Sequence, residues 1–115
     1  MVQDKKQPLD LEDIVRLANQ VGLEYVEARR LSEKLEMLKA TEKARITDSY
    51  DDGSISEAKL KRLTETDEKW VLFLDKLADA RAKSEALKVR YDSYKNLFEA
   101  KRSLMSYRKA EMRHL

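Results

Sequence analysis

The scarcity of helix-breaking residues constrains this chain more than any other feature. Its 115 residues include two glycines, Gly22 and Gly53, and one proline, Pro8. Only Asp51-Asp52-Gly53 combines a breaker with turn formers, because Asp side chains bond nearby backbone and glycine accepts a positive φ. The sequence therefore predicts two long helical runs joined by one turn over residues 48–54.

The first helical run carries one apolar stripe. Asp10 is the expected N-cap, and apolar residues then recur at steps of three and four. The stripe comprises Ile14, Leu17, Ala18, Val21, Tyr25, Ala28, Leu31, Leu35 and Leu38. This pattern predicts an amphipathic helix over residues 10–47, preceded by a flexible N-terminus over residues 1–9. Gly22 inside it indicates either a close helix contact or a tolerated defect.

The second run is less regular. Ser54 and Glu57 fit a capping box, with Ser56 as an alternative cap. Apolar residues continue at Leu60, Leu63, Trp70, Leu74 and Leu77. The polar segment 64–67 interrupts them and offers a second cap, so 55–113 is either one helix or a bent one. We favour the continuous helix because neither glycine nor proline marks a break.

Composition supports one all-α domain over residues 10–115, a long helical hairpin of two main helices. Charged residues make up 40% of the chain and there is no cysteine, which excludes disulfides and thiolate chemistry. A helical pair leaves an apolar edge uncovered, so we expect a homo-oligomeric helical assembly. No apolar run approaches the roughly 18 residues of a membrane span, and no signal peptide is evident, so we expect a cytoplasmic protein that binds no membrane.

Charge is distributed unevenly along the chain. Residues 48–80 carry five cations and nine anions, whereas residues 81–115 carry ten cations and four anions. The basic C-terminal part suggests either an anionic partner or pairing with the acidic middle of another subunit.

The C-terminal part also concentrates aromatic side chains among cations. An aromatic stripe at helical spacing is typical of a core or a subunit interface, but rings between cations can also stack bases of single-stranded nucleic acid. The interspersed leucines favour hydrophobic assembly. The predicted core and oligomer residues are Trp70, Leu74, Leu87, Tyr91, Tyr94, Phe98, Leu104 and Met105. Arg102, Arg108 and Lys109 flank this stripe and are predicted to reach phosphate or an acidic neighbour.

No enzyme site assembles in the sequence. His114 is the only histidine and lies next to the C-terminus, where a catalytic base or metal ligand is not expected. There is no glycine-rich phosphate loop, and the Asp residues near Gly53 lack the spacing of a calcium loop. We predict no catalytic residue, no metal and no cofactor.

A short motif around the turn resembles a known family. A long helix ends in Lys43-Ala44-Arg45-Ile46, Tyr50 and Asp51-Asp52-Gly53 follow, and a second long helix carries aromatics in its C-terminal half. This arrangement resembles the phage recombination mediator UvsY family. The resemblance implies an all-helical subunit in a ring-like homo-oligomer, acting in a phage-infected bacterium. It implies binding of single-stranded DNA, contact with a strand-exchange recombinase and displacement of single-strand binding protein.

The resemblance also suggests which residues touch DNA. The family's DNA-binding cations align with Lys43 and Arg45. The turn here is shorter and more acidic than in the family, with three Asp within seven residues of Arg45, and the chain is shorter than the best-known member. Two alternatives stay open. Lys43 and Arg45 can be solvated cations that favour a helix C-terminus. The chain can also be a coiled-coil adaptor, or a small phage inhibitor of a host protein, that binds no DNA.

Overall fold

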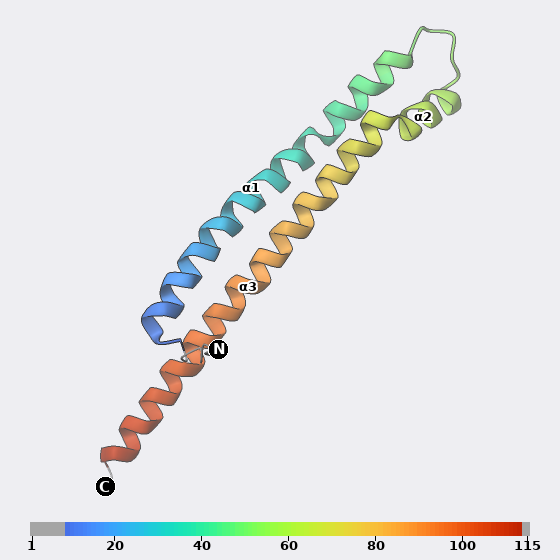
Figure 1. Cartoon of the computed structure of the whole chain (residues 1–115). Helices are drawn as coiled ribbons and strands as arrows, with labels where there is room; N and C mark the ends of the chain where they lie inside the picture. Colours follow the sequence, from blue (N-terminus) through green and yellow to red (C-terminus); the bar gives the residue numbers. More distant parts are fainter. Residues whose placement is uncertain (1–8, 114–115) are drawn as a thin grey trace, which may run out of the picture. The chain divides into compact units, whose positions relative to one another are not determined.

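The computed structural model describes residues 9–113, and these residues form three helices and no strand. They are α1 (Leu11–Tyr50), α2 (Glu57–Thr66) and α3 (Glu68–Arg113) (Figure 1). The prediction of an all-α helical hairpin is confirmed. Residues 1–8 of the N-terminus predicted to be flexible over 1–9 lie outside the described residues, and so does His114.

Contacts divide the hairpin into two compact units. The turn unit is Val26–Glu85, which holds the second half of α1, all of α2 and the start of α3. The terminal unit consists of the described residues up to Tyr25 and from Ala86 onward. The two units are described separately below.

Helix α1 begins where the sequence predicts and ends later. The Asp10 carboxylate accepts a hydrogen bond from the backbone N–H of Asp13 at 2.7 Å, as expected of an N-cap. The predicted end at residue 47 is wrong by three residues, because α1 continues to Tyr50. The Thr47 hydroxyl lies 3.0 Å from the Thr64 hydroxyl of α2, and the Tyr50 hydroxyl donates to the Asp67 carboxylate. Tertiary contacts therefore prolong the helix.

A turn follows α1, as predicted, but it spans residues 51–56 and not 48–54, because residues 48–50 belong to α1 and α2 begins at Glu57. The Asp51 carboxylate accepts from the Gly53 N–H at 3.0 Å, and Gly53 has a positive φ of 86°. The proposed capping box is wrong, because Ser56, the alternative cap, begins α2 by accepting from the Lys59 N–H at 3.3 Å. Ser54 is engaged elsewhere, since both its N–H and its hydroxyl donate to the Asp52 carboxylate.

The second helical run is broken at Asp67, so the favoured continuous helix is wrong. Asp67 is extended, with ψ of 133°, and ends α2. One of its carboxylate oxygens accepts from the N–H groups of Lys69, at 2.8 Å, and Trp70, at 3.4 Å. A side chain that satisfies the first donors of the next helix can stop one helix and start another without glycine or proline.

In the turn unit, α1 packs on α3 through a narrow apolar seam. Leu35, Leu77 and Ala80 are buried together, with Phe73 packed against them. Trp70 is only 4% exposed, which confirms the prediction that it is buried, and its ring stacks on Phe73 with centroids 5.8 Å apart.

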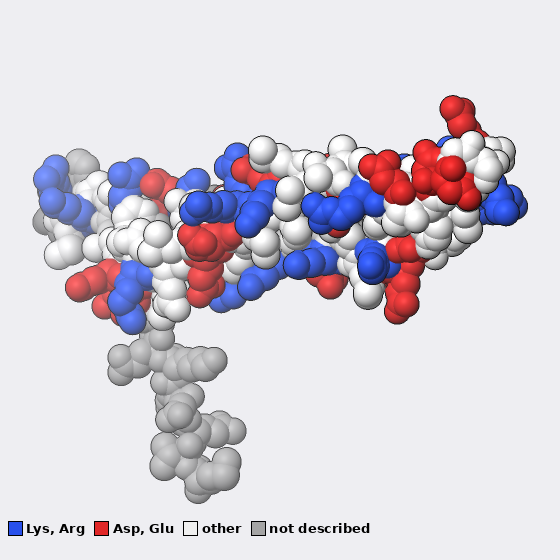
Figure 2. All heavy atoms as spheres, turned by 90° about the horizontal axis from the view of Figure 1, so that it is seen from above, with Lys and Arg blue, Asp and Glu red and all other residues white. Residues whose placement is uncertain are grey.

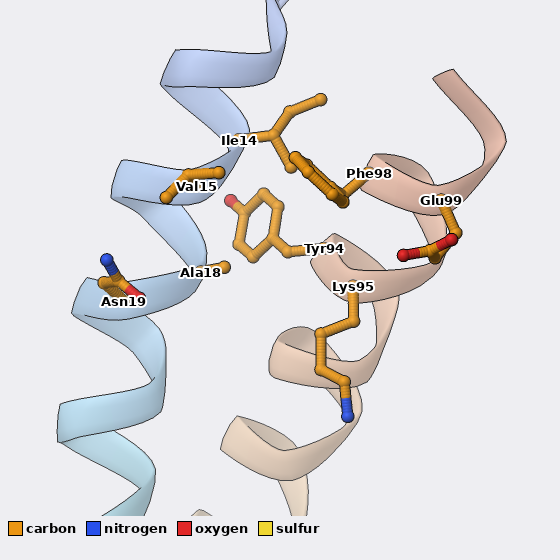
Figure 3. A pocket seen from close by; sticks show the side chains of 8 residues that line it. All are labelled: Ile14, Val15, Ala18, Asn19, Tyr94, Lys95, Phe98 and Glu99. Atoms are coloured by element: carbon orange, nitrogen blue, oxygen red, sulfur yellow. The ribbon is translucent and has the colours of Figure 1, made fainter. Parts of the chain in front are cut away.

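In the terminal unit, the start of α1 packs on the second half of α3. Ile14, Val21 and Leu87 are buried. Figure 3 shows Tyr94 and Phe98 pointing from α3 toward α1, where they line a hollow of roughly 220 Å³. The Tyr91 ring lies against Gly22, which settles the role of that glycine as a close helix contact.

Most buried positions of the two long helices, α1 and α3, recur every seven residues. On α3 the buried and half-buried positions are 70, 77, 84, 91 and 98, with 73, 80, 87, 94 and 101; the half-buried Asp92 is the one exception among the described residues of this helix. Such a repeat is typical of coiled-coil packing. On α1 the same repeat includes Leu35 and leaves out Leu31 and Leu38, which are 47% and 37% exposed. The predicted stripe was therefore too wide at these two residues.

Candidate nucleic-acid interface

Lys43 lies near the end of α1 in the turn unit. Its side chain is exposed, and its ammonium nitrogen sits 5.7 Å from the centre of the Trp70 ring. A cation over an aromatic face is attracted by the electron density of the ring. The contact orders the ammonium group at the surface and leaves its N–H donors directed away from the ring free for an anion.

Arg45 does not share this position. Two residues further along an α-helix correspond to a rotation of about 200°, so Arg45 faces away from the side that holds Lys43. It pairs with Glu42 at 2.8 Å, and its side chain is 71% exposed. The Glu42 side chain is half-buried, but an ion pair whose guanidinium is largely in solvent contributes little to stability, so Arg45 can exchange Glu42 for phosphate at small cost.

Two hydroxyl-centred contacts hold the end of α1 in place. The hydroxyls of Thr47 and Thr64 lie 3.0 Å apart, and Thr64 is buried at 1% exposure. The Tyr50 hydroxyl donates to the Asp67 carboxylate at 2.5 Å. This hydrogen bond is the main cause that lowers the pKa of Asp67 and raises the pKa of Tyr50. The carboxylate is therefore ionised and the phenol protonated at neutral pH, and the bond between them is charge-assisted.

The cations predicted near the C-terminus belong to the terminal unit. Arg102 pairs with Glu99 at 2.9 Å, and both side chains are exposed. Arg108 and Lys109 are exposed and have no charged partner among residues 9–113. Arg108 lines an open hollow beside Asp10 and Glu12, at the start of α1.

The predicted core and oligomer residues divide into two groups. Trp70 and Leu87 are buried, and Tyr91, Tyr94 and Phe98 are half-buried against α1. Their rings pack within the hairpin, so they are not a free surface for stacking bases. The other group faces solvent in the single chain: Leu74, Leu104 at 48% exposure and Met105 at 56%. Their predicted role in assembly stays a prediction.

Figure 2 shows how the charged side chains are distributed over one face of the molecule. Lys and Arg side chains lie among Asp and Glu side chains on this face. Several cations are matched by carboxylates of the same helix, as in the pairs Arg16–Asp13 and Arg29–Glu33. In each of these pairs the carboxylate partly neutralises the cation, which weakens its attraction for a polyanion.

Sequence reasoning missed the partners that fix this site. The contact between Lys43 and Trp70, and the bond between Tyr50 and Asp67, each join residues 17 or more positions apart. The only local signal was the polar interruption at 64–67, which offered a cap at Asp67. Nothing in a single sequence pairs that cap with Tyr50.

Other kinds of site have little support in the described part of the chain. No group of three or more metal-ligating side chains occurs among residues 9–113. Within the same residues, no helix has both the length and the apolarity to cross a membrane. Comparison with protein-family models, with curated proteins and with solved structures finds no match for this chain.

Proposed function

We propose that this chain binds single-stranded DNA without regard to base sequence and acts as a recombination mediator. In this role it helps a strand-exchange recombinase replace single-strand binding protein on the strand. The observation that carries the proposal is the position of Lys43, an exposed cation ordered over Trp70 within the motif that resembles the UvsY family. Phosphates are bound by such cations without any contact to base edges.

The proposal requires several copies of the chain. Lys43 and Arg45 point to different sides of α1, and the Glu42 carboxylate partly neutralises Arg45. A single subunit therefore offers few phosphate contacts and binds weakly. A ring-like homo-oligomer would repeat these contacts along the strand and multiply the affinity. The exposed Leu104 and Met105 supply apolar surface for such an assembly.

The test is a binding titration at two salt concentrations. Polarisation of a labelled single-stranded oligonucleotide is measured for the wild type and for the double variant Lys43→Ala, Arg45→Ala. We expect the double variant to bind more weakly and with a shallower salt dependence, because each lost phosphate contact removes about 0.7 from the slope of log K against log salt. Its oligomer size should stay unchanged, since both side chains are exposed.

A matched control separates a site from general electrostatics. Arg30→Ala, Lys34→Ala removes the same charge from exposed positions of the same helix and the same unit. This control should retain most of the binding. Absence of salt-sensitive binding by the wild type at low salt would refute the proposal. An equal loss in both double variants would refute the assignment of Lys43 and Arg45.

A second candidate function is a coiled-coil adaptor, or an inhibitor, that binds a protein and no DNA. Apolar side chains outside the seam favour it: Leu23, Val26 and Met37 on α1 are all more than half exposed, as are Leu72 and Val89 on α3. Such residues are suited to packing against another helix. This candidate predicts no binding of the oligonucleotide at low salt.

A further inference from the structure

The last two turns of α1 are joined to α2 and α3 by a ladder of three contacts. Lys43 lies over Trp70, Thr47 meets Thr64, and Tyr50 bonds Asp67. Lys43 and Tyr50 are seven residues apart, which returns to the same side of an α-helix within about 20°. The three contacts therefore lie along one face of α1, inside the turn unit. The contact of Lys43 is the one farthest from the turn.

Asp67 couples the two ends of this ladder. One of its oxygens accepts from the Lys69 and Trp70 N–H groups at the start of α3, and the other accepts from the Tyr50 hydroxyl. The carboxylate thus fixes the backbone of Trp70 and the end of α1 at the same time. A change at Tyr50 alters where α1 sits relative to the Trp70 ring, and hence where the Lys43 ammonium lies.

We propose that Tyr50 and Asp67 are positioning residues that hold the Lys43 ammonium over Trp70, ready to bind a phosphate of single-stranded DNA. This inference rests on the proposed function. A lysine that is already ordered loses less conformational freedom on binding than a free one, so its phosphate contact is tighter. Without the bond between Tyr50 and Asp67, Lys43 keeps its charge and loses its fixed position.

The test removes one hydroxyl and leaves the charge untouched. Tyr50→Phe keeps the ring and loses the donor to Asp67. Tyr25→Phe is the matched control, because it makes the same chemical change on α1, and the Tyr25 hydroxyl has no hydrogen-bond partner among residues 9–113. Two quantities are measured for each variant: the affinity for a labelled single-stranded oligonucleotide, and the NMR shift of the Lys43 ε-methylene group. The indole ring current moves that shift upfield while the contact with Trp70 persists.

We expect Tyr50→Phe to move the Lys43 signal downfield and to weaken DNA binding about twofold to tenfold, the range for ordering one side chain. The salt dependence should stay that of the wild type, because no charge is lost. Tyr25→Phe should leave both quantities unchanged. A change in melting temperature alone would not move the Lys43 signal, so this readout separates positioning from general stability.

The outcomes that overturn the inference are distinct. If Lys43→Ala weakens binding while Tyr50→Phe behaves like Tyr25→Phe, the positioning role is wrong and the proposed function stands. If the Lys43 signal does not move in Tyr50→Phe, the coupling through Asp67 is wrong whatever the affinity. If the wild type binds no oligonucleotide, the proposed function is wrong and this inference is wrong with it.

Discussion

Gly22 allows α1 and α3 to approach closely in the terminal unit, and replacing it with alanine tests this directly. A Cβ added at Gly22 would lie 3.1 Å from Cε1 and 3.3 Å from Cδ1 of Tyr91. Favourable contacts between carbon atoms lie at about 3.5–4.0 Å. The new methyl would therefore stand several tenths of an ångström too close to an aromatic ring that is half-buried against α1.

Two opposing effects set the magnitude. Alanine favours a helix interior over glycine by about 1 kcal/mol. Overpacking at a close contact costs about 1–3 kcal/mol. We therefore expect Gly22→Ala to lie between neutral and about 2 kcal/mol destabilising. In a Tyr91→Ala background the ring is gone, and the same substitution should stabilise the protein by about 1 kcal/mol.

The assay is a double-mutant cycle by urea denaturation, followed by circular dichroism at one fixed protomer concentration. The coupling free energy between the two sites should be about 1–3 kcal/mol. Loss of the Lys95 contact over the Tyr91 ring cancels in the cycle, because both Tyr91→Ala variants lack it.

Gly53→Ala is the control for this cycle. Nothing lies within 4 Å of a Cβ at that position, and its φ of 86° makes alanine unfavourable there for reasons of backbone alone. Its effect on stability should be the same with and without the Tyr91 ring. A gain of about 1 kcal/mol from Gly22→Ala in both Tyr91 backgrounds would show that the helices do not approach closely at Gly22.

Three further predictions concern the turn unit and the C-terminal part of α3. Trp70→Ala removes a buried ring and should lower the free energy of unfolding by about 3–5 kcal/mol in thermal or urea denaturation. Leu72→Ala, at an exposed position, should have little effect. Equal losses in the two variants would contradict the burial of Trp70 between α1 and α3. Because the pKa of Asp67 is lowered and that of Tyr50 is raised, the stability that their bond provides should be present from about pH 5 to 9. It should fade as Asp67 is protonated below about pH 4 and as Tyr50 ionises above about pH 10, so the stability difference between wild type and Tyr50→Phe should shrink at both extremes. Truncation before Leu104 should give smaller species by light scattering and weaker DNA binding, and a truncated protein that stays fully assembled would show that assembly does not use this segment.

Local chemistry in the sequence was enough to predict the class of fold, the start of α1 and the turn. Asp10, Asp51 and Gly53 act through bonds or backbone angles within a few residues of themselves, so their roles can be read without a partner. The burial of Trp70 also followed from its place in an apolar pattern.

The details that shape the candidate site depend on contacts across the hairpin. Leu31 and Leu35 are equally apolar, and only the position of α3 decides that Leu35 is buried and Leu31 is not. The spacing of apolar residues predicts that a helix has an apolar face. It does not predict which leucines on that face contact the neighbouring helix.

The break at Asp67 shows the same division between local and tertiary information. The sequence of the polar segment 64–67 allows a helix cap at Asp67. In the structure, the Asp67 carboxylate that caps α3 also accepts a hydrogen bond from the Tyr50 hydroxyl of α1. The sequence placed Lys43 at the end of a helix, and the tertiary structure placed it over Trp70. Both contacts join residues that are distant in the chain, and single-sequence patterns carry no information about such pairs.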